Sequence, residues 1–335
     1  MNDDERRTDL DGPADQFGVT HDAVTVFDLS DRTQIELTGA DRAKFLHGFC
    51  TNDIKRLTPG QGCEAFLTNI KGRVVGHIFV FATETSLWLD TVSGQGEAII
   101  SHLDRYLIRE DVQFVSHSGR GELFVTGPHA AQLLMLDESL PPYGRIARES
   151  FGQPFDIRRV DFFGAPGFLI SLPLAALEAM RSSLLAVGCV AGASELFESL
   201  RIAAGFPRYG IDITDENLAQ EAARTPQCIS FTKGCYLGQE PIARLDAMGH
   251  TNRELRRLHF TPGTRPHPGM KLLAAETTDE AGVLTSVAPL LTATGETPAL
   301  GYLKTKFGKP GTRVRAVATG ETFADPATAP VGTVQ

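Results

Sequence analysis

One ten-residue stretch, Phe231 to Glu240, gathers more chemically active side chains than any other part of the chain. It reads Phe-Thr-Lys-Gly-Cys-Tyr-Leu-Gly-Gln-Glu. Two glycines four positions apart let the backbone turn tightly. Pro241 follows, and proline is well placed in the first turn of a helix. The thiol of Cys235 would then lie near a helix N-terminus with the ammonium of Lys233 nearby, and both would favour a reactive thiolate.

The same residues allow a structural explanation, in which Cys235 is a small buried apolar residue and the glycines serve packing. Four further cysteines stand at 50, 63, 189 and 228, and none forms a C-x-x-C pair. Such an odd, sparse set indicates a reduced, cytoplasmic protein without a disulfide framework. Because a single thiolate cannot hold an iron–sulfur cluster alone, we expect no stably bound metal.

The composition limits the classes of function. The 335 residues are 42% hydrophobic and 22% charged, with a formal net charge of −9 and a pI near 5.5. This acidity argues against broad, nonspecific binding of nucleic acid. No apolar run reaches about 18 residues, so no membrane span is predicted. The acidic first residues lack the apolar core of a secretory signal, which also favours the cytoplasm.

The elements expected around the motif alternate between strands and helices. Strand patterns at 24–29 and 34–37 precede a short helix, and a hairpin over 62–81 follows. A similar order of strand, helix, strand, strand and helix recurs over 123–186. From 258 onward, short β patterns broken by glycine and proline indicate a small barrel. The predicted fold class is therefore α+β, with two related antiparallel αβ units and a C-terminal β-barrel.

These patterns divide the chain into five segments. We expect a disordered lead-in over 1–20 and a first αβ unit over 21–118. The second αβ unit, over 119–257, carries the motif. A C-terminal β-barrel over 258–321 and a flexible tail over 322–335 complete the prediction.

The string from Lys233 to Glu240, K-G-C-Y-L-G-Q-E, resembles the signature of the YgfZ group in the glycine-cleavage T-protein (GcvT) superfamily. The runs F-D-L-S-D-R and G-A-D-R-A-K-F-L near the start add to this resemblance, which covers about 22 to 320 and is most specific over 196–260. It implies two αβ units around a central cleft and a bound tetrahydrofolate. It also implies an accessory role that supports iron–sulfur enzymes or their assembly proteins, including tRNA-modifying enzymes.

The resemblance implies a folate site built around the motif. A reduced folate presents a flat pterin and an anionic glutamate tail. Aromatic and amide side chains would contact the pterin: Phe66, Asn69, Tyr236 and Gln239. Three cations would contact the tail: Lys233, Arg73 and Arg244. Glu240 would brace the cleft beside them. Cys235 is the candidate functional thiol, and Lys233 would tune it.

Two departures from the superfamily bear on this function. The superfamily's L-R-x-E-A-G segment, whose glutamate helps to hold the pterin, here has Ala203 in place of that glutamate. T-proteins, which pass a one-carbon unit to tetrahydrofolate, carry a paired aspartate after a glycine-rich hairpin, whereas this chain has Gly76 and His77. Losing that carboxylate argues against an aminomethyltransferase and favours a non-catalytic role. His77 could act as a base, although a lone strand histidine is more often structural.

A tRNA-binding or protein-interaction module is a further alternative. Residues 233–257 hold five Lys or Arg side chains against three acids, and the run from Arg253 to Arg257 could contact phosphate. A solvated strand edge would explain the same charges. The sequence fixes neither the client enzyme, the native ligand nor the oligomeric state.

Overall fold

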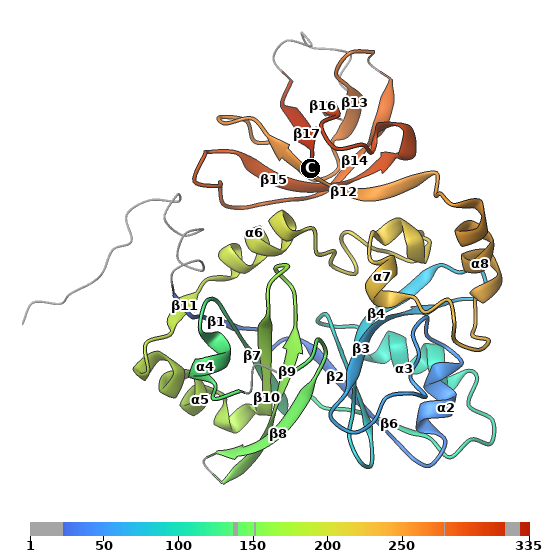
Figure 1. Ribbon diagram of the computed structural model, residues 1–335, viewed down its shortest axis with the longest axis vertical. Helices are drawn as coiled ribbons and strands as arrows, with labels where there is room; N and C mark the ends of the chain where they lie inside the picture. The colour runs from blue at the N-terminus through green and yellow to red at the C-terminus, as the bar shows by residue number, and fades with distance from the viewer. Residues whose placement is uncertain (1–22, 137–139, 151, 278, 319–328) are drawn as a thin grey trace, which may run out of the picture.

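The structure is a computed structural model that describes residues 23–136, 140–150, 152–277, 279–318 and 329–335. The described chain forms two open sheets and one closed barrel (Figure 1). This arrangement, with helices packed on the sheets, confirms the predicted α+β class. The predicted lead-in over 1–20 lies outside the described residues.

A five-stranded sheet forms the first unit. Its strands lie in the order β3-β4-β5-β2-β6, and every neighbouring pair is antiparallel. Two helices, α2 and α3, cover one of its faces. The bounds are β2 (Thr33–Thr38), α2 (Arg42–His47), β3 (Gly62–Thr68), β4 (Val74–Ala82), β5 (Leu87–Thr91), α3 (Gly96–Asp104) and β6 (Gln113–Ser116).

A six-stranded sheet forms the second unit, in the order β11-β1-β7-β10-β9-β8. The first strand of the described residues, β1 (Thr25–Asp28), pairs antiparallel with β7 and parallel with β11, so it belongs to this sheet. The predicted boundaries put it in the first unit, and this part of the prediction is wrong. The other bounds are β7 (Arg120–Thr126), α4 (Ala130–Leu133), β8 (Arg145–Ser150), β9 (Gln153–Val160), β10 (Gly167–Pro173), α5 (Leu174–Ala186) and β11 (Val190–Gly192).

The barrel closes in the order β12-β15-β14-β13-β16-β17. It begins at Arg253, before the predicted boundary at 258. Its last strand, Val331–Val334, pairs with both β12 and β16, so the predicted flexible tail over 322–335 is wrong for these residues: the barrel needs this strand to close. The bounds are β12 (Arg253–Phe260), β13 (Lys271–Ala274), β14 (Glu280–Val287), β15 (Thr297–Lys304), η2 (Thr305–Phe307), β16 (Arg313–Val317) and β17 (Val331–Val334).

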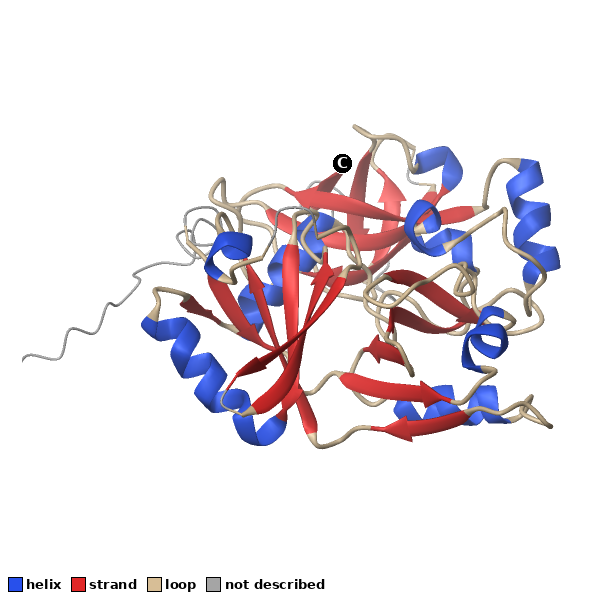
Figure 2. Cartoon of the chain, turned by 60° about the horizontal axis from the view of Figure 1, so that its bottom comes forward, coloured by secondary structure: helices blue, strands red, loops and turns tan. Residues whose placement is uncertain are grey.

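Four helical segments connect the second sheet to the barrel: α6 (Ser194–Ala204), η1 (Ala219–Ala222), α7 (Thr225–Cys228) and α8 (Gln239–Met248). The first of them, α6, lies between the sheets and the barrel, and it ends at Gly205, which adopts φ 81°. Figure 2 shows α5 and the helices of the first unit on the outer sides of the sheets. None of the helices in the described ranges is long and apolar enough to cross a membrane.

Strand alternation decides which side chains face the centre of the molecule. In β4, Ile78 and Val80 enter the core shared with α2 and α3, whereas Phe79 joins an aromatic cluster with the second sheet. Successive side chains of a strand point to opposite faces, so His77 shares the inner face with Phe79. In the neighbouring β3, Glu64 is on that face for the same reason. The inner faces of both sheets therefore meet in a mixed aromatic and polar interior.

Candidate functional site

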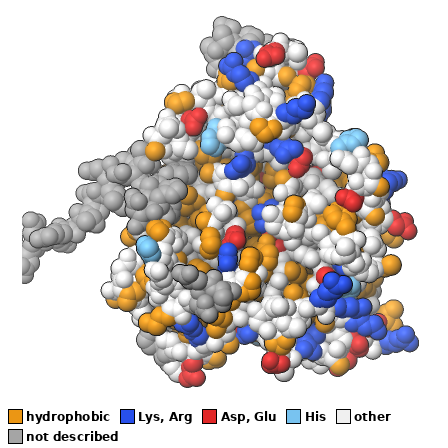
Figure 3. All heavy atoms as spheres, in the orientation of Figure 1, with side chains coloured by type: hydrophobic (Ala, Val, Ile, Leu, Met, Phe, Trp, Pro, Cys, Tyr) orange, Lys and Arg blue, Asp and Glu red, His pale blue; other side chains and the backbone are white. Residues whose placement is uncertain are grey.

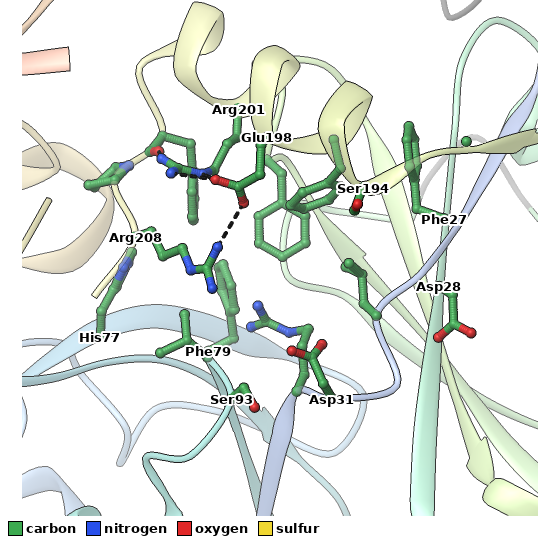
Figure 4. Close-up of a pocket in the computed structure, with 18 residues that line it drawn as sticks. Phe27, Asp28, Asp31, His77, Phe79, Ser93, Ser194, Glu198, Arg201 and Arg208 are labelled. Atoms are coloured by element: carbon green, nitrogen blue, oxygen red, sulfur yellow. Dashed lines mark hydrogen bonds and ion pairs between the residues drawn. The ribbon is translucent and has the colours of Figure 1, made fainter. Parts of the chain in front are cut away.

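A cavity of about 270 Å³ lies between the inner faces of the two sheets and α6. The surface in Figure 3 is hollowed at the centre, and hydrophobic side chains lie in the hollow. Figure 4 shows the lining residues. They come from strands β1, β4 and β11, from helix α6 and the segment after it, and from the chain that follows β1, β5 and β9. Segments far apart in the sequence thus build one site at the junction of the units.

Five phenylalanines make up most of the apolar wall: Phe27, Phe79, Phe162, Phe197 and Phe206. The ring centroids of Phe162 and Phe206 are 5.0 Å apart, and those of Phe79 and Phe162 are 5.6 Å apart, both pairs edge to face. Aromatic pairs favour this geometry, and their packing fixes each ring. The wall is therefore a preformed surface suited to a flat ligand ring.

Charged side chains from α6 and the segment after it form one rim of the cavity. Arg201 is buried and bound on both sides, with its Nε 2.9 Å from Glu198 and its Nη1 2.8 Å from Asp212. Among the described residues, the Arg208 side chain forms an ion pair with the other oxygen of Glu198 alone, at 3.1 Å, and this side chain is 40% exposed. Figure 4 shows this contact as a dashed line at the cavity. Of these two cations, Arg208 is the one free to bind an anionic ligand.

On the opposite side, Arg32 links the cavity to a buried charge network between the sheets. Its Nε lies 2.8 Å from Asp90 and 3.5 Å from Glu122, and its guanidinium stands 5.2 Å from the centre of the Phe162 ring. Burial, followed by the neighbouring Asp90 carboxylate, raises the pKa of Glu122 well above its usual range. The Arg32 guanidinium is therefore paired with carboxylates of the protein and holds the two sheets together beneath the cavity.

His77 lines the cavity at the edge of a second polar cluster. Its Nε2 lies 2.7 Å from Oε1 of Glu64, which is fully buried. Glu64 also accepts hydrogen bonds from Nε of Arg224 at 2.9 Å and from the hydroxyl of Tyr143 at 2.7 Å. Burial acts to raise the pKa of Glu64, but the hydrogen bond with His77 and the neighbouring guanidinium of Arg224 lower it well below its usual range. Glu64 is thus an ionised carboxylate in the interior.

The thiol of Cys228 completes this cluster, 3.9 Å from Nε2 of His77. The donor atoms of Glu64, His77 and Cys228 lie within 4.8 Å of one another, which is close enough to suggest a metal site. However, the guanidinium of Arg224 already binds Glu64, and burial raises the pKa of Cys228 well above its usual value. A neutral thiol and a carboxylate paired with arginine are poor partners for a cation.

Within the motif, the structure gives Lys233 a different role from the one predicted. Its ammonium is buried and donates hydrogen bonds to the carbonyl oxygens of His47, Cys50 and Asn52, at 2.6, 2.6 and 2.9 Å. It also stands 4.7 Å from the centre of the Tyr236 ring. The prediction that Lys233 tunes Cys235 does not fit this position, because the ammonium holds the end of α2 and the chain that follows it.

Cys235 is exposed, whereas Cys50, Cys63, Cys189 and Cys228 are buried. It precedes the turn that starts α8, and the glycine this turn requires is Gly238, at φ +83°. A Cβ on Gly238 would lie 2.3 Å from the carbonyl oxygen of Asn69. Gly234, by contrast, avoids the left-handed region, and the nearest atom to an added Cβ is 3.9 Å away. The motif therefore presents Cys235 on a surface loop that Gly238 anchors.

The other predicted folate contacts lie outside the residues that line the cavity. Phe66 and Tyr236 belong to a core cluster beneath the motif, and burial raises the pKa of Tyr236 to about 12. The Asn69 side chain accepts from the backbone of Lys71 and Arg73 in the β3–β4 turn. Three predicted contacts lie in the first turns of α8: Gln239, Glu240 and Arg244. Glu240 and Arg244 are exposed, whereas Gln239 is partly buried.

Arg73 donates a hydrogen bond to the carbonyl oxygen of Glu216, at a surface groove separate from the cavity. Ala203 also lies elsewhere than expected. Together with Leu200 and Arg257, it lines a separate hollow on the other side of α6. The central cavity therefore lacks no carboxylate because of Ala203, and Ala203 no longer argues against tetrahydrofolate binding there.

Sequence reasoning missed most residues of the cavity, including Arg208. It also missed Glu64 and Arg224 of the polar cluster beside the cavity. A signal for Glu64 existed in the alternation of β3, where it is the acid on the face opposite to Cys63 and Ala65. An acid at an inward position of an apolar strand needs buried partners. Arg208 and Arg224 lie in segments without regular periodicity, so no local pattern could assign them to the site.

Known proteins share this architecture. The structure superposes on aminomethyltransferase T of the glycine cleavage system from Bartonella henselae with a TM-score of 0.81 and 22% sequence identity, covering 96% of this chain and 88% of that one. At this identity the match concerns the fold. The fold prediction, two αβ units and a barrel of the GcvT type, is confirmed.

Sequence comparison finds relatives over most of the chain. A chloroplastic protein of Arabidopsis thaliana with a provisional transferase name is 29% identical over 250 residues, which are 72% of this chain and 58% of that protein. The mitochondrial aminomethyltransferase of Mesembryanthemum crystallinum is 28% identical over 322 residues, 89% of this chain and 76% of that enzyme. The sequence profile of the GCVT N-terminal domain matches residues 7–225. The chain therefore belongs to the GCVT family.

Proposed function

We propose that the chain binds tetrahydrofolate in its central cavity and acts as a cytoplasmic accessory protein for iron–sulfur enzymes, including tRNA-modifying ones. The observation that carries the folate part is the phenylalanine wall with the exposed cation of Arg208 at its rim. The accessory part follows the resemblance of the motif to the YgfZ group, and the exposure of Cys235 supports it.

The residues of the cavity fit a folate in size and in chemistry. Ligand pockets usually hold about 300 to 1,000 Å³, so a cavity of about 270 Å³ suits a bicyclic ring while the remainder of the ligand extends outward. The rings of Phe79, Phe162 and Phe206 would hold the pterin, and Arg208 would bind a carboxylate of the tail. When bound, tetrahydrofolate supplies a carrier for one-carbon groups.

Cys235 is the residue that would contact a partner enzyme. As the exposed member of five cysteines, it can reach an oxidised thiol or a cluster ligand on another protein, whereas the buried four cannot. Transient contact of this kind needs no permanent metal centre. The partners proposed are iron–sulfur enzymes or the proteins that assemble their clusters.

A calorimetric titration with tetrahydrofolate under anaerobic, reducing conditions tests the folate part. We expect saturable binding in the micromolar range, and Arg208→Ala should weaken it about tenfold by removing one charge-assisted contact. Arg244→Ala is the matched control, because Arg244 is an exposed cation outside the cavity, and its affinity should equal that of wild type. Absence of binding at millimolar folate, or weakening by Arg244→Ala alone, would contradict the proposal.

A second candidate is a folate-dependent one-carbon transferase, favoured by the aminomethyltransferase names of several relatives. Against it stands Gly76, whose position in β4 faces Ile99 and offers no carboxylate. His77, which lines the cavity, is the base such an enzyme would have to use. Formation of methylenetetrahydrofolate by the purified protein from an aminomethyl donor, with release of ammonia, would establish this activity instead if it were abolished in His77→Phe.

tRNA as a direct partner is the third candidate. The basic run predicted for it lies in β12, where Arg253 contacts Glu221 at 3.2 Å and Arg256 contacts Glu254 at 2.7 Å. Because acids offset these cations, the charge available for phosphate is small. Gel-shift titration with tRNA at increasing salt would test it, since phosphate contacts give a steep salt dependence.

A further inference from the structure

The imidazole of His77 is held in one orientation at the boundary between the cavity and the polar cluster around Glu64. Its ring is stacked on Phe206, with centroids 5.6 Å apart and planes at 26°. Its Nε2 points to Glu64 at 2.7 Å. Within the described residues, Nδ1 has no hydrogen-bond partner, and His77 is one of the side chains that line the cavity. One nitrogen is thus bound to the protein and the other is available.

The partners of Glu64 determine which nitrogen carries the proton. An ionised carboxylate only accepts hydrogen bonds, so Nε2 must be the protonated nitrogen. The guanidinium of Arg224 already offsets the single negative charge of Glu64. A neutral imidazole keeps this buried cluster balanced, whereas a second cation would lack a counter-ion. In this tautomer Nδ1 has a free lone pair.

Cys228 does not change this assignment. Its sulfur lies 3.9 Å from Nε2, the same nitrogen that Glu64 binds, so it does not form a nucleophile–base pair through Nδ1. Burial, followed by the charge of Glu64, raises the pKa of the thiol well above its usual value and keeps it neutral. The pair of Glu64 and His77 therefore acts through Nδ1 alone.

We propose that Glu64 and His77 form a carboxylate–imidazole pair that presents a hydrogen-bond-accepting nitrogen to the cavity and selects pterins that carry N–H groups at N5 and N8. This inference rests on the proposed function in that the ligand is taken to be a folate. Tetrahydropterin rings carry N–H groups that fully oxidised pterins lack. The oxidised ring instead presents nitrogen lone pairs, which Nδ1 would repel. The pair thus makes the cavity selective for reduced over oxidised folate.

The selectivity test compares two ligands on two variants. Wild-type protein should bind tetrahydrofolate more tightly than folic acid, and His77→Phe, which keeps a ring on Phe206 but removes the acceptor, should reduce this ratio about tenfold. His117→Phe is the matched control: His117 also pairs with a carboxylate through Nε2, Glu36 at 3.0 Å, but does not line the cavity. Its ratio should equal that of wild type.

The outcomes separate the inference from the proposed function. Wild-type protein that binds neither folate contradicts the proposed function and, with it, the selectivity. Wild-type protein that binds tetrahydrofolate with the same ratio in His77→Phe contradicts the selectivity alone. Equal loss of the ratio in His117→Phe would also overturn it, because the effect would then be general to histidine replacement.

The tautomer can be measured without any ligand. In protein labelled with ¹⁵N-histidine at mildly alkaline pH, long-range ¹H–¹⁵N correlation spectra distinguish a protonated ring nitrogen from a bare one, and the spectrum of His77→Phe assigns the signal. We expect a protonated Nε2 and a bare Nδ1. A protonated Nδ1 would overturn the inference whatever the folate titrations give.

Discussion

The motif loop, residues 231–240, and the central cavity are built in opposite ways. The loop takes its residues from one stretch of chain and divides them: Lys233 points inward to three carbonyl groups, while Cys235 is exposed. The cavity takes its residues from distant strands and helices and turns them toward one point. The contiguous residues that are easiest to recognise thus mostly hold the loop in place, and dispersed residues make the pocket.

This difference also separates two kinds of chemistry. At the loop, a solvent-exposed thiol can meet another protein. At the cavity, phenylalanines and fixed ion pairs can hold a ring, but the groups are beyond the reach of a large partner. The variants below test whether the two regions are as distinct as their geometry indicates.

The largest effect is expected at the anchoring glycine of the loop. Gly238→Ala places a Cβ at φ +83° and 2.3 Å from the carbonyl oxygen of Asn69, so backbone must move. We expect the free energy of unfolding to fall by about 3 kcal/mol. Urea unfolding followed by circular dichroism measures this change.

Gly234→Ala is the matched control in the same motif, because an added Cβ there meets its nearest atom at 3.9 Å. Its stability should stay within about 0.5 kcal/mol of wild type. Comparable losses at both glycines would mean that the loop needs flexibility throughout, and the division of the motif into an anchor and an exposed arm would be wrong.

A smaller loss is expected at the buried ammonium. Lys233→Met leaves three carbonyl oxygens after α2 without their donor, while it also removes a charge that burial disfavours. We expect a net loss of about 2 kcal/mol in the free energy of unfolding. The reaction rate of Cys235 with a thiol reagent should not change in the folded protein.

The thiol rate therefore decides between the predicted and the observed role of Lys233. A rate that falls several-fold in Lys233→Met, in protein of near-native stability, would restore the sequence-based view that the ammonium activates the thiol. The same measurement on Lys71→Met, a change to an exposed lysine in the β3–β4 turn, corrects for the general loss of one positive charge.

The sequence predicted the fold where local pattern and resemblance agreed. The alternation over 62–81 gave the hairpin of β3 and β4, and the glycine and proline breaks beyond 258 gave a barrel. The failures lie in long-range pairing. Nothing local shows that β1 joins a sheet with β7 or that Val331–Val334 completes the barrel, because both depend on partners about a hundred and about seventy residues away.

The site was harder to predict for the same physical reason. Residue types indicated that Lys233 and Cys235 could interact, but Lys233 is buried and Cys235 is exposed. Conversely, His77 was recognisable only as a lone strand histidine, because its partner Glu64 and the stacking ring of Phe206 come from other segments. Side-chain direction within a strand is predictable from alternation, whereas the identity of the facing group is not.

The smallest effect on stability, and the sharpest test of the comparison, is expected at Cys235. Because the side chain is exposed, Cys235→Ser should change the free energy of unfolding by less than about 0.5 kcal/mol and leave folate affinity unaltered. It should nevertheless fail to support iron–sulfur enzyme activity in cells that lack the wild-type protein. Arg208→Ala, which keeps the thiol and weakens the cavity, is the counterpart. If both variants fail to support the enzymes, the thiol and the cavity act in the same process. Full support by Cys235→Ser would instead mean that the cavity is the functional site and that the loop has a structural role.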